Sequence, residues 1–173
     1  MDIAENGIGA GAGLIDIAVR EDIKGNRLIV GIKDNGRGIP AGLLDHVTDP
    51  FYTTRTTRRV GLGLSLFREA SKRCEGDFKI MSREGEGTEV VASFRLDHID
   101  LAPLGNMAGS LTSLIMGNPH VDFVYTHEVD GKVFRLDTRE VKKELEGTEI
   151  THPQVIQFLG DLIRESLADV RKV

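Results

Sequence analysis

The chain has one cysteine, no long apolar run and no excess of basic residues, and each shortage excludes a class of protein. Cys74 alone cannot form an internal disulfide, and a single thiol is typical of the reducing cytoplasm, where we expect the protein. No apolar run reaches the roughly 20 residues of a membrane-spanning helix, and the acidic N-terminus is unlike a signal peptide. The net charge of -5 argues against nucleic acid, so we expect neither a nucleic-acid nor a membrane partner.

Several familiar site motifs are also missing. There is no G-x-x-x-x-G-K-[ST] loop, which excludes a P-loop enzyme. Alternating glycines between residues 7 and 13 suggest a dinucleotide fingerprint, but the first two starting points lack glycine at the sixth position. The five histidines show no zinc-type spacing, so we assign none of them as a metal ligand.

A chain of 173 residues can form one domain with a real core plus an appendage. Hydrophobic content of 40% and charged content of 28% are ordinary for a globular protein. An acidic stretch over residues 97–104 contains Pro103 and is predicted to be a linker. We therefore expect a domain over residues 1–97 and a small α+β appendage of unknown role over residues 105–173.

Apolar periodicity predicts an alternation of helices and strands. Strands are expected over residues 14–21, 27–33, 78–82, 89–96, 121–129 and 132–136, the last two joined by Asp130-Gly131. Helices are expected over residues 1–11, 43–47, 62–74, 107–116, 137–146 and 151–170. The inward stripe of the 62–74 helix is predicted as Leu62, Leu66 and Ala70. That of the last helix is predicted as Val155, Phe158, Leu159, Leu162 and Leu167.

The most informative stretch runs from Asp34 to Pro40 (DNGRGIP) and follows the buried strand 27–33. An acid at a strand end, beside glycines that let the backbone turn, can accept hydrogen bonds from an amino group of a planar ligand. The alternative is an ordinary turn, because Asp-Asn-Gly is turn chemistry in any protein.

Other segments accompany this one in a fixed order. Asp2–Asn6 lies on the first expected helix, Asp49–Arg55 is a polar loop with an aromatic anchor, Gly61–Ser65 (GLGLS) opens a helix, and Gly85–Thr88 opens a strand. Together the five segments resemble the nucleotide-binding boxes of the GHKL superfamily of gyrase-type topoisomerases, heat-shock chaperones, histidine kinases and MutL-type repair proteins, over residues 1 to about 96. The resemblance implies an α/β, Bergerat-type two-layer sandwich with a mixed sheet backed by helices, and ATP or ADP bound on the helical face under a lid.

The resemblance assigns roles to residues of the first box. It implies that Asn6 binds the Mg²⁺ that bridges the nucleotide phosphates, which suits a hard cation that takes most ligands from phosphate. The position of the family's general-base Glu holds Asp2, which is one methylene shorter and could polarise an attacking water. The alternative for Asp2 is an acid that only favours the helix dipole.

The other boxes supply the remaining contacts that the resemblance implies. Asp34 accepts from the adenine amine, Thr88 supports that contact through its hydroxyl, and Gly36 and Gly38 give the base room. The phosphates lie at the helix N-terminus formed by Gly61, Leu62, Gly63 and Leu64. Thr54 and Arg55 contact the nucleotide from the lid, although exposed loop arginines are more often simply solvated.

Relatives of this kind usually carry a strand and helix before the first box, and their absence here leads us to expect a truncated start. The alternative is that the C-terminal part of the chain covers the surface left exposed. The leading hypothesis is a slow Mg-ATPase or nucleotide-dependent switch that acts on an unidentified protein partner. The alternatives are a histidine or serine protein kinase acting in trans and an ATP sensor that does not hydrolyse. The oligomeric state stays open.

Overall fold

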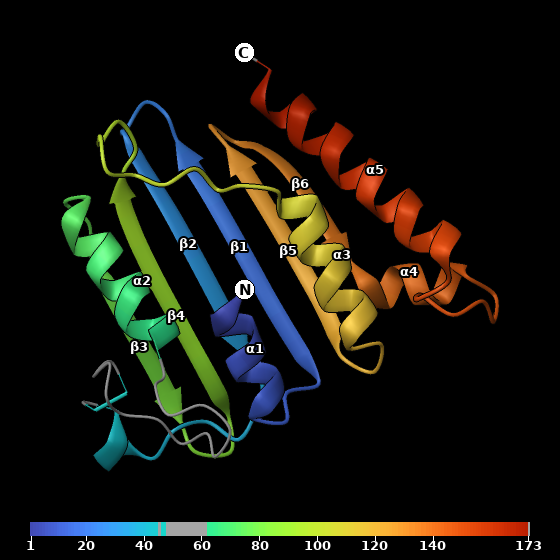
Figure 1. The fold of residues 1–173 in the computed structure, drawn as a ribbon, viewed down its shortest axis with the longest axis horizontal. Coiled ribbons are helices and arrows are strands. Elements are labelled where there is room, and N and C mark those ends of the chain that lie inside the picture. Colours follow the sequence, from blue (N-terminus) through green and yellow to red (C-terminus); the bar gives the residue numbers. More distant parts are fainter. Residues whose placement is uncertain (45, 48–61, 173) are drawn as a thin grey trace.

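A computed structural model describes residues 1–44, 46–47 and 62–172, and it shows a mixed six-stranded sheet with helices over one face (Figure 1). The strand order is β3-β4-β2-β1-β5-β6. The strands are β1 (Leu14–Asp22), β2 (Arg27–Asp34), β3 (Phe78–Arg83), β4 (Gly87–Arg95), β5 (Asp122–Val129) and β6 (Lys132–Asp137). The helices are α1 (Asp2–Gly9), the short 3-10 helix η1 (Ala41–Leu43), α2 (Leu62–Arg73), α3 (Met107–Gly117), α4 (Thr138–Glu144) and α5 (Pro153–Arg171). Within the described ranges, none of these helices combines the length and apolar character needed to cross a bilayer.

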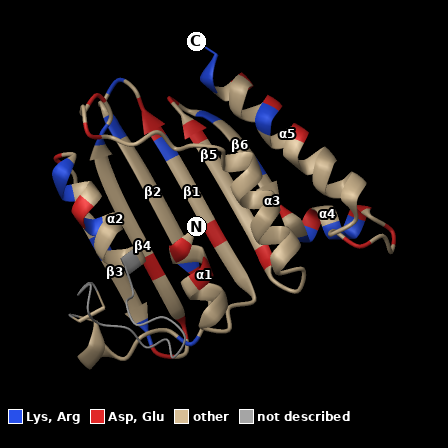
Figure 2. Cartoon of the chain, viewed as in Figure 1, with Lys and Arg blue, Asp and Glu red and all other residues tan. Residues whose placement is uncertain are grey.

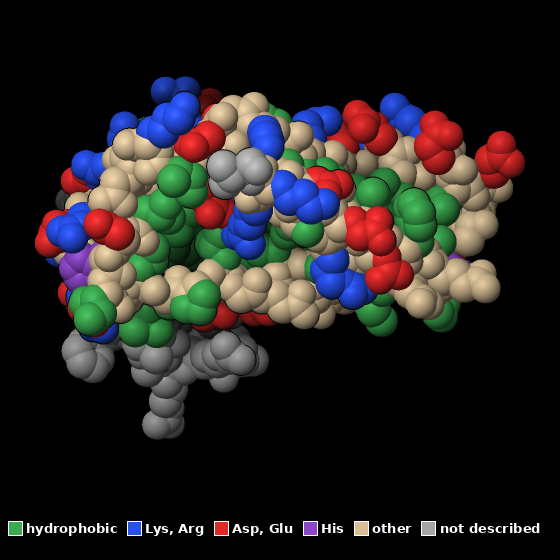
Figure 3. Space-filling model, turned by 90° about the horizontal axis from the view of Figure 1, so that it is seen from above, with side chains coloured by type: hydrophobic (Ala, Val, Ile, Leu, Met, Phe, Trp, Pro, Cys, Tyr) green, Lys and Arg blue, Asp and Glu red, His purple; other side chains and the backbone are tan. Residues whose placement is uncertain are grey.

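The period of two along the strands separates a buried face from a solvent face. Ile15, Ile17 and Val19 of β1 are buried beneath the helices, whereas Ala18 and Arg20 point to the other side and are exposed. In the view from above, hydrophobic side chains are visible in a band across the molecule, with charged side chains among and around them (Figure 3). Basic and acidic positions are interspersed along α2 and α5 (Figure 2). The core therefore lies between the helices and one face of the sheet.

Residues beyond the 97–104 linker join this sheet directly. The sequence predicts an α+β appendage there, and the structure has helices and strands close to the expected ranges. However, β5 pairs in parallel with β1, with Ile15 opposite Phe123, so one sheet runs through both parts of the chain. Parallel partners are joined by long crossovers, and no local pattern reveals which distant strand a segment will pair with.

The inward face of α2 differs from the predicted stripe. Leu66 is 59% exposed and Ala70 is exposed as well, while Ser71 and Cys74 are buried. The helix is turned so that Phe67 packs on Phe78 and Phe94, with ring centroids 6.3 Å and 5.7 Å apart. The Ser71 hydroxyl donates to the carbonyl of Ser93, so this small polar residue brings the helix close to β4. The positions of the apolar residues alone therefore predicted the wrong inward face for α2.

Two smaller helix predictions are also wrong in detail. On α5 the predicted Leu159 and Leu167 are buried and Val155 and Leu162 pack against the core, but Phe158 is 63% exposed, and the buried Gly160 and Ile163 were not predicted. The short helix expected over residues 43–47 is instead a 3-10 turn over Ala41–Leu43 that starts directly after Pro40. Proline fixes its own φ and favours helix initiation just after it, which explains the earlier start.

A network of hydrogen-bonded polar side chains links α5 to the sheet. His127 is fully buried, with Nδ1 2.6 Å from the Tyr125 hydroxyl and Nε2 2.7 Å from Glu21 Oε1. Arg171 donates to the same Glu21 oxygen at 2.6 Å and 3.0 Å. Because the carboxylate only accepts, His127 donates from Nε2. Burial lowers the pKa of His127 and favours the neutral imidazole, whose Nδ1 then accepts from the Tyr125 hydroxyl.

The protonation states of His127 and Glu21 are coupled to folding. Burial lowers the pKa of His127, against the opposing effect of Glu21. Burial alone would raise the pKa of Glu21, but hydrogen bonds from Arg171 and His127 outweigh it and hold the pKa below its usual value. Both depressed values mean that the unfolded chain binds protons which the fold does not, so acid destabilises the protein through both groups.

We predict that the free energy of unfolding falls as the pH drops below about 6.5, where the unfolded histidine begins to charge. The loss through Glu21 follows in the lower window below about pH 4.5. His127→Gln should flatten the dependence between about pH 7.5 and about pH 5.5, measured by urea unfolding. Substitution of the exposed His120 by Gln serves as the control and should keep the wild-type slope. An unchanged slope in His127→Gln would contradict this account.

Candidate nucleotide site

Asp34 stands at the end of β2, on the face of the sheet that α1 covers. It pairs with Ile15 of β1 on one side and with Thr88 of β4 on the other. Residues directly opposite one another in a sheet share a face, so Ile15, Asp34 and Thr88 form one row beneath the helices. The Gly36 N–H donates to Asp34 Oδ1 at 2.8 Å, which fixes the carboxylate at the start of the following loop.

The Asp34 carboxylate has unusual electrostatics for a turn residue. Burial raises its pKa, while backbone N–H groups of Gly36 and Thr88 partly oppose that effect. Among the described residues, the groups that stabilise the negative charge of Asp34 are therefore backbone N–H dipoles. A half-buried acid of this kind gains from an additional hydrogen-bond donor, and an N–H on a planar ligand is such a donor.

Glycines let the backbone approach this acid closely. A Cβ on Gly7 of α1 would lie 2.7 Å from Ile15 Cδ1 and 2.8 Å from Asp34 Cβ, so α1 packs on Asp34 without room for a side chain. Gly38 has a φ of +69°, and a Cβ there would meet the carbonyl of Arg83. Gly38 thus lets the loop pack on β3, Gly36 lets it pack on Ala10 at the end of α1, and Gly7 supports the site from α1.

We predict that Gly7→Ala destabilises the protein by about 1–3 kcal/mol, because it overpacks the contact between α1 and Asp34. Gly9 on the same helix provides a matched control, since a Cβ there has nothing within 4 Å. Gly9→Ala should be neutral or stabilising by at most about 1 kcal/mol. Urea unfolding of the two variants measures the difference, and equal stabilities would show that α1 does not pack as described.

The beginnings of α1 and α2 meet near this acid. A Cβ on Gly63 would lie 2.9 Å from Asp2 Cβ, so the Asp2 side chain lies beside the first turn of α2. Asn6 stands one turn further along α1 and is half-buried, and Leu64 is half-buried in the first turn of α2. The N-terminus of a helix offers bare N–H groups to an anion. An acid, an amide and a helix N-terminus are thus assembled at one end of the site.

The donor set suits a magnesium ion held mainly by phosphate. Across residues 1–44, 46–47 and 62–172, no group of three or more His, Cys, Asp or Glu side chains is placed to hold a metal. The amide oxygen of Asn6 is a hard ligand, and Mg²⁺ usually takes one or two protein oxygens together with substrate phosphates. The residues present therefore fit this cation in a phosphate-bridged form.

Part of the predicted site lies outside the described residues. This holds for Thr54, Arg55 and Gly61, and for the side chain of Leu62. The structure brings together Asp34, Gly36, Gly38 and Thr88 at one point, and Asp2, Asn6 and Gly63 at another beside it.

Sequence reasoning missed Ser82. This residue of β3 pairs with Thr88, and the two hydroxyl oxygens lie 2.8 Å apart. Counting outward from the turn at Gly85 across the hairpin would have placed Ser82 opposite Thr88. Ser82 belongs to none of the five motifs identified in the sequence.

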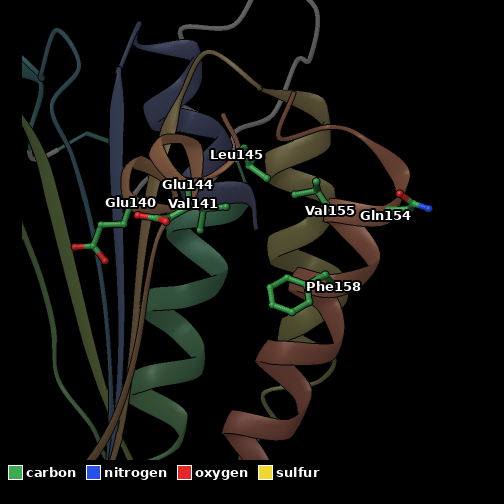
Figure 4. Close-up of a pocket in the computed structure, with 7 residues that line it drawn as sticks. All are labelled: Glu140, Val141, Glu144, Leu145, Gln154, Val155 and Phe158. Atoms are coloured by element: carbon green, nitrogen blue, oxygen red, sulfur yellow. The ribbon is translucent and has the colours of Figure 1, made fainter. Parts of the chain in front are cut away.

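A separate hollow of about 480 Å³ lies between α4 and α5 and shares no residue with the Asp34 row (Figure 4). Leu145, Val155 and Phe158 point toward the gap between the two helices, and Glu140 and Glu144 lie at its edge. The hollow is thus distinct from the nucleotide-site residues.

Comparisons with known proteins agree with this geometry. The family model described as histidine kinase-, DNA gyrase B-, and HSP90-like ATPase matches residues 1–98. The sensor protein kinase WalK of Staphylococcus haemolyticus is 33% identical over 91 residues, which are 50% of this chain and 15% of that kinase. The chain therefore spans only a small part of the length of this curated relative.

Two solved structures share the fold. The Aquifex aeolicus MutL ATPase domain complexed with ADP has a TM-score of 0.52 at 17% identity, covering 86% of this chain and 67% of that one. The N-terminal domain of a DNA repair protein has a TM-score of 0.56 at 15% identity, covering 99% of this chain and 55% of that one. The expected α/β sandwich of mixed sheet and helices is confirmed, and the likeness in fold extends through β5, β6 and α5.

Proposed function

Because the chain belongs to the histidine kinase-, DNA gyrase B- and HSP90-like ATPase family, we propose that it binds Mg-ATP on the helical face of its sheet. The observation that carries the proposal is the half-buried Asp34 carboxylate, held by backbone N–H groups and faced by Thr88. Asp34 accepts from the adenine amine, and Gly36 and Gly38 let the loop that follows it pack closely on Ala10 and Arg83. The phosphates lie toward the N-terminus of α2, near Asn6.

The Asp2 and Asn6 pair supports a slow ATPase or nucleotide-dependent switch. Asn6 would hold the cation, and Mg²⁺ would supply positive charge that neutralises part of the phosphate charge. Asp2, beside Gly63, orients or deprotonates the attacking water. Slow turnover lets the bound state last long enough for a protein partner to read it.

A free, buried Cys74 fits a reducing cytoplasm as the compartment.

Phosphotransfer in trans is a second candidate, favoured by the likeness to the sensor protein kinase WalK over half of this chain. The same nucleotide site would then present its γ-phosphoryl group to a side chain of another protein. Label transferred from γ-labelled ATP to a co-purified protein would single out this candidate. A pure ATP sensor would bind ATP and show neither label transfer nor turnover.

We predict selective binding of Mg-ATP and Mg-ADP over Mg-GTP in calorimetric titrations, and a loss of more than about tenfold in affinity for Asp34→Asn. Without nucleotide the same variant should be more stable at neutral pH. Burial raises the pKa of Asp34, so its charged form opposes folding above that pKa and the neutral amide removes the cost. Urea unfolding of the variant without nucleotide measures this stability, so that a loss of binding is separated from unfolding.

Asp16 provides the matched control for this experiment. It lies on the neighbouring strand, is half-buried, and has a pKa that burial also raises, but it pairs with Lys33 on the opposite face of the sheet. Asp16→Asn should bind ATP like the wild type. Wild-type protein that binds no nucleotide, or an Asp34→Asn variant that binds ATP normally, would refute the proposed site.

The role of Asp2 is tested by steady-state turnover of Mg-ATP. Asp2→Asn should lower the rate by about a hundredfold while ATP affinity changes little, since general-base groups contribute roughly this much. Glu5→Gln, an exposed acid on the same helix, is the control and should leave the rate unchanged. Equal turnover in Asp2→Asn and wild type would remove Asp2 from the mechanism.

A further inference from the structure

The Ser82 hydroxyl occupies the next position in the row that contains Asp34 and Thr88. Register pairs Asp34 with Thr88 and Thr88 with Ser82, so the three side chains share the helix-covered face across β2, β4 and β3 (Figure 1). Ser82 Oγ makes three short contacts, each at 2.8 Å. They join it to the Ile39 N–H, the Gly87 carbonyl and the Thr88 hydroxyl.

The direction of each hydrogen bond follows from counting protons. A serine hydroxyl has one proton and two lone pairs. The Ile39 N–H only donates and the Gly87 carbonyl only accepts, so the single Ser82 proton points to Gly87. The remaining lone pair of Ser82 then accepts from Thr88. If Ser82 donated to Thr88 instead, its oxygen would face the Gly87 oxygen at 2.8 Å with no proton between them, which is unfavourable.

This arrangement fixes what Thr88 presents to a ligand. A threonine hydroxyl that rotates freely can either donate or accept. Because the only proton of Thr88 points to Ser82, the lone pairs of Thr88 face away from Ser82, on the side of its cross-strand partner Asp34. The ionised Asp34 carboxylate also only accepts. The two groups together form a surface made of acceptors.

We propose that Ser82 is a specificity-determining positioning residue, which holds Thr88 as an acceptor so that the site selects a purine with an amino group at C6 over one with a carbonyl there. The inference rests on the proposed nucleotide site and deepens it. A 6-amino purine offers the donor that both acceptors need. A 6-oxo purine places its oxygen against these acceptors, and its own donor, N1–H, lies one ring position away, so the acceptor aligned with C6 is left unpaired.

Ser82 also links this selection to the loop after β2. Its oxygen accepts from Ile39, and the Gly85 N–H donates to the Arg37 carbonyl at 2.7 Å, so the turn between β3 and β4 and the Asp34–Pro40 loop are held together. Removing the Ser82 hydroxyl therefore frees Thr88 and loosens one loop contact. The test must separate these two effects.

The experiment compares Mg-ATP with Mg-ITP by calorimetry on the full chain, because the two nucleotides differ only in the group at C6 and in the proton that hypoxanthine carries at N1. Wild type should prefer ATP by more than about tenfold. Ser82→Ala should reduce that preference by about tenfold, mainly through tighter ITP binding, because the freed Thr88 hydroxyl can now donate to O6. Ser82→Thr keeps a hydroxyl and should restore the preference.

Two further variants separate positioning from general damage. Ser71→Ala removes another hydroxyl that donates to a backbone carbonyl, far along α2, and should keep the wild-type preference. In a double-mutant cycle, Ser82→Ala should have no additional effect on the preference once Thr88→Val has removed the hydroxyl that it orients. If Ser82→Ala does not fold, Thr88→Val is tested alone, and it should also lower the preference for ATP over ITP.

The outcomes distinguish this inference from the proposed function beneath it. Wild type that binds no ATP would refute the nucleotide site itself. Wild type that binds ATP and ITP equally would overturn the inference and leave nucleotide binding intact. It would also be overturned if Ser82→Ala weakened both nucleotides by the same factor, or if its effect on the preference persisted in the Thr88→Val background.

Discussion

The candidate site depends on the strand register that places Ile15, Asp34, Thr88 and Ser82 in one row beneath the helices. Because side chains alternate along a strand, a slip of one residue in β2 would send Asp34 to the solvent face and turn its apolar neighbours outward. Burial of the hydrophobic face therefore enforces the position of the polar row at its end. Burial raises the pKa of Asp34, as expected for a half-buried acid whose charged form is disfavoured at that position.

The opposite end of the same face carries a second polar group with a different character. Glu21 accepts from both His127 and Arg171, and His127 also contacts Tyr125, whereas Asp34 is held only by backbone N–H groups among its described partners. A closed network fixes structure, and an acid with spare acceptor capacity is suited to a ligand. This contrast assigns the first group to attachment of α5 and the second to recognition.

Local patterns in the sequence predicted much of the fold. The hairpin turn at Asp130-Gly131, the Asp137 cap of α4 and Pro153 at the start of α5 all lie where turn and cap chemistry placed them. Long-range arrangements were not predictable in this way. No local sequence pattern indicates that β5 pairs in parallel with β1. The orientation of α2 is set by the packing of Phe67 against Phe78 and Phe94, which lie on β3 and β4. Ser82 was missed because its importance arises only when the register places it opposite Thr88.

A crystal structure of the chain with ADP and Mg²⁺ tests the central claim most directly. The account predicts the adenine amine within hydrogen-bond distance of the Asp34 carboxylate, with the Thr88 hydroxyl on the same edge of the base. The phosphates should lie at the first turn of α2. An adenine ring bound elsewhere, for example between α4 and α5, or turned so that its amine points away from Asp34, would contradict the account.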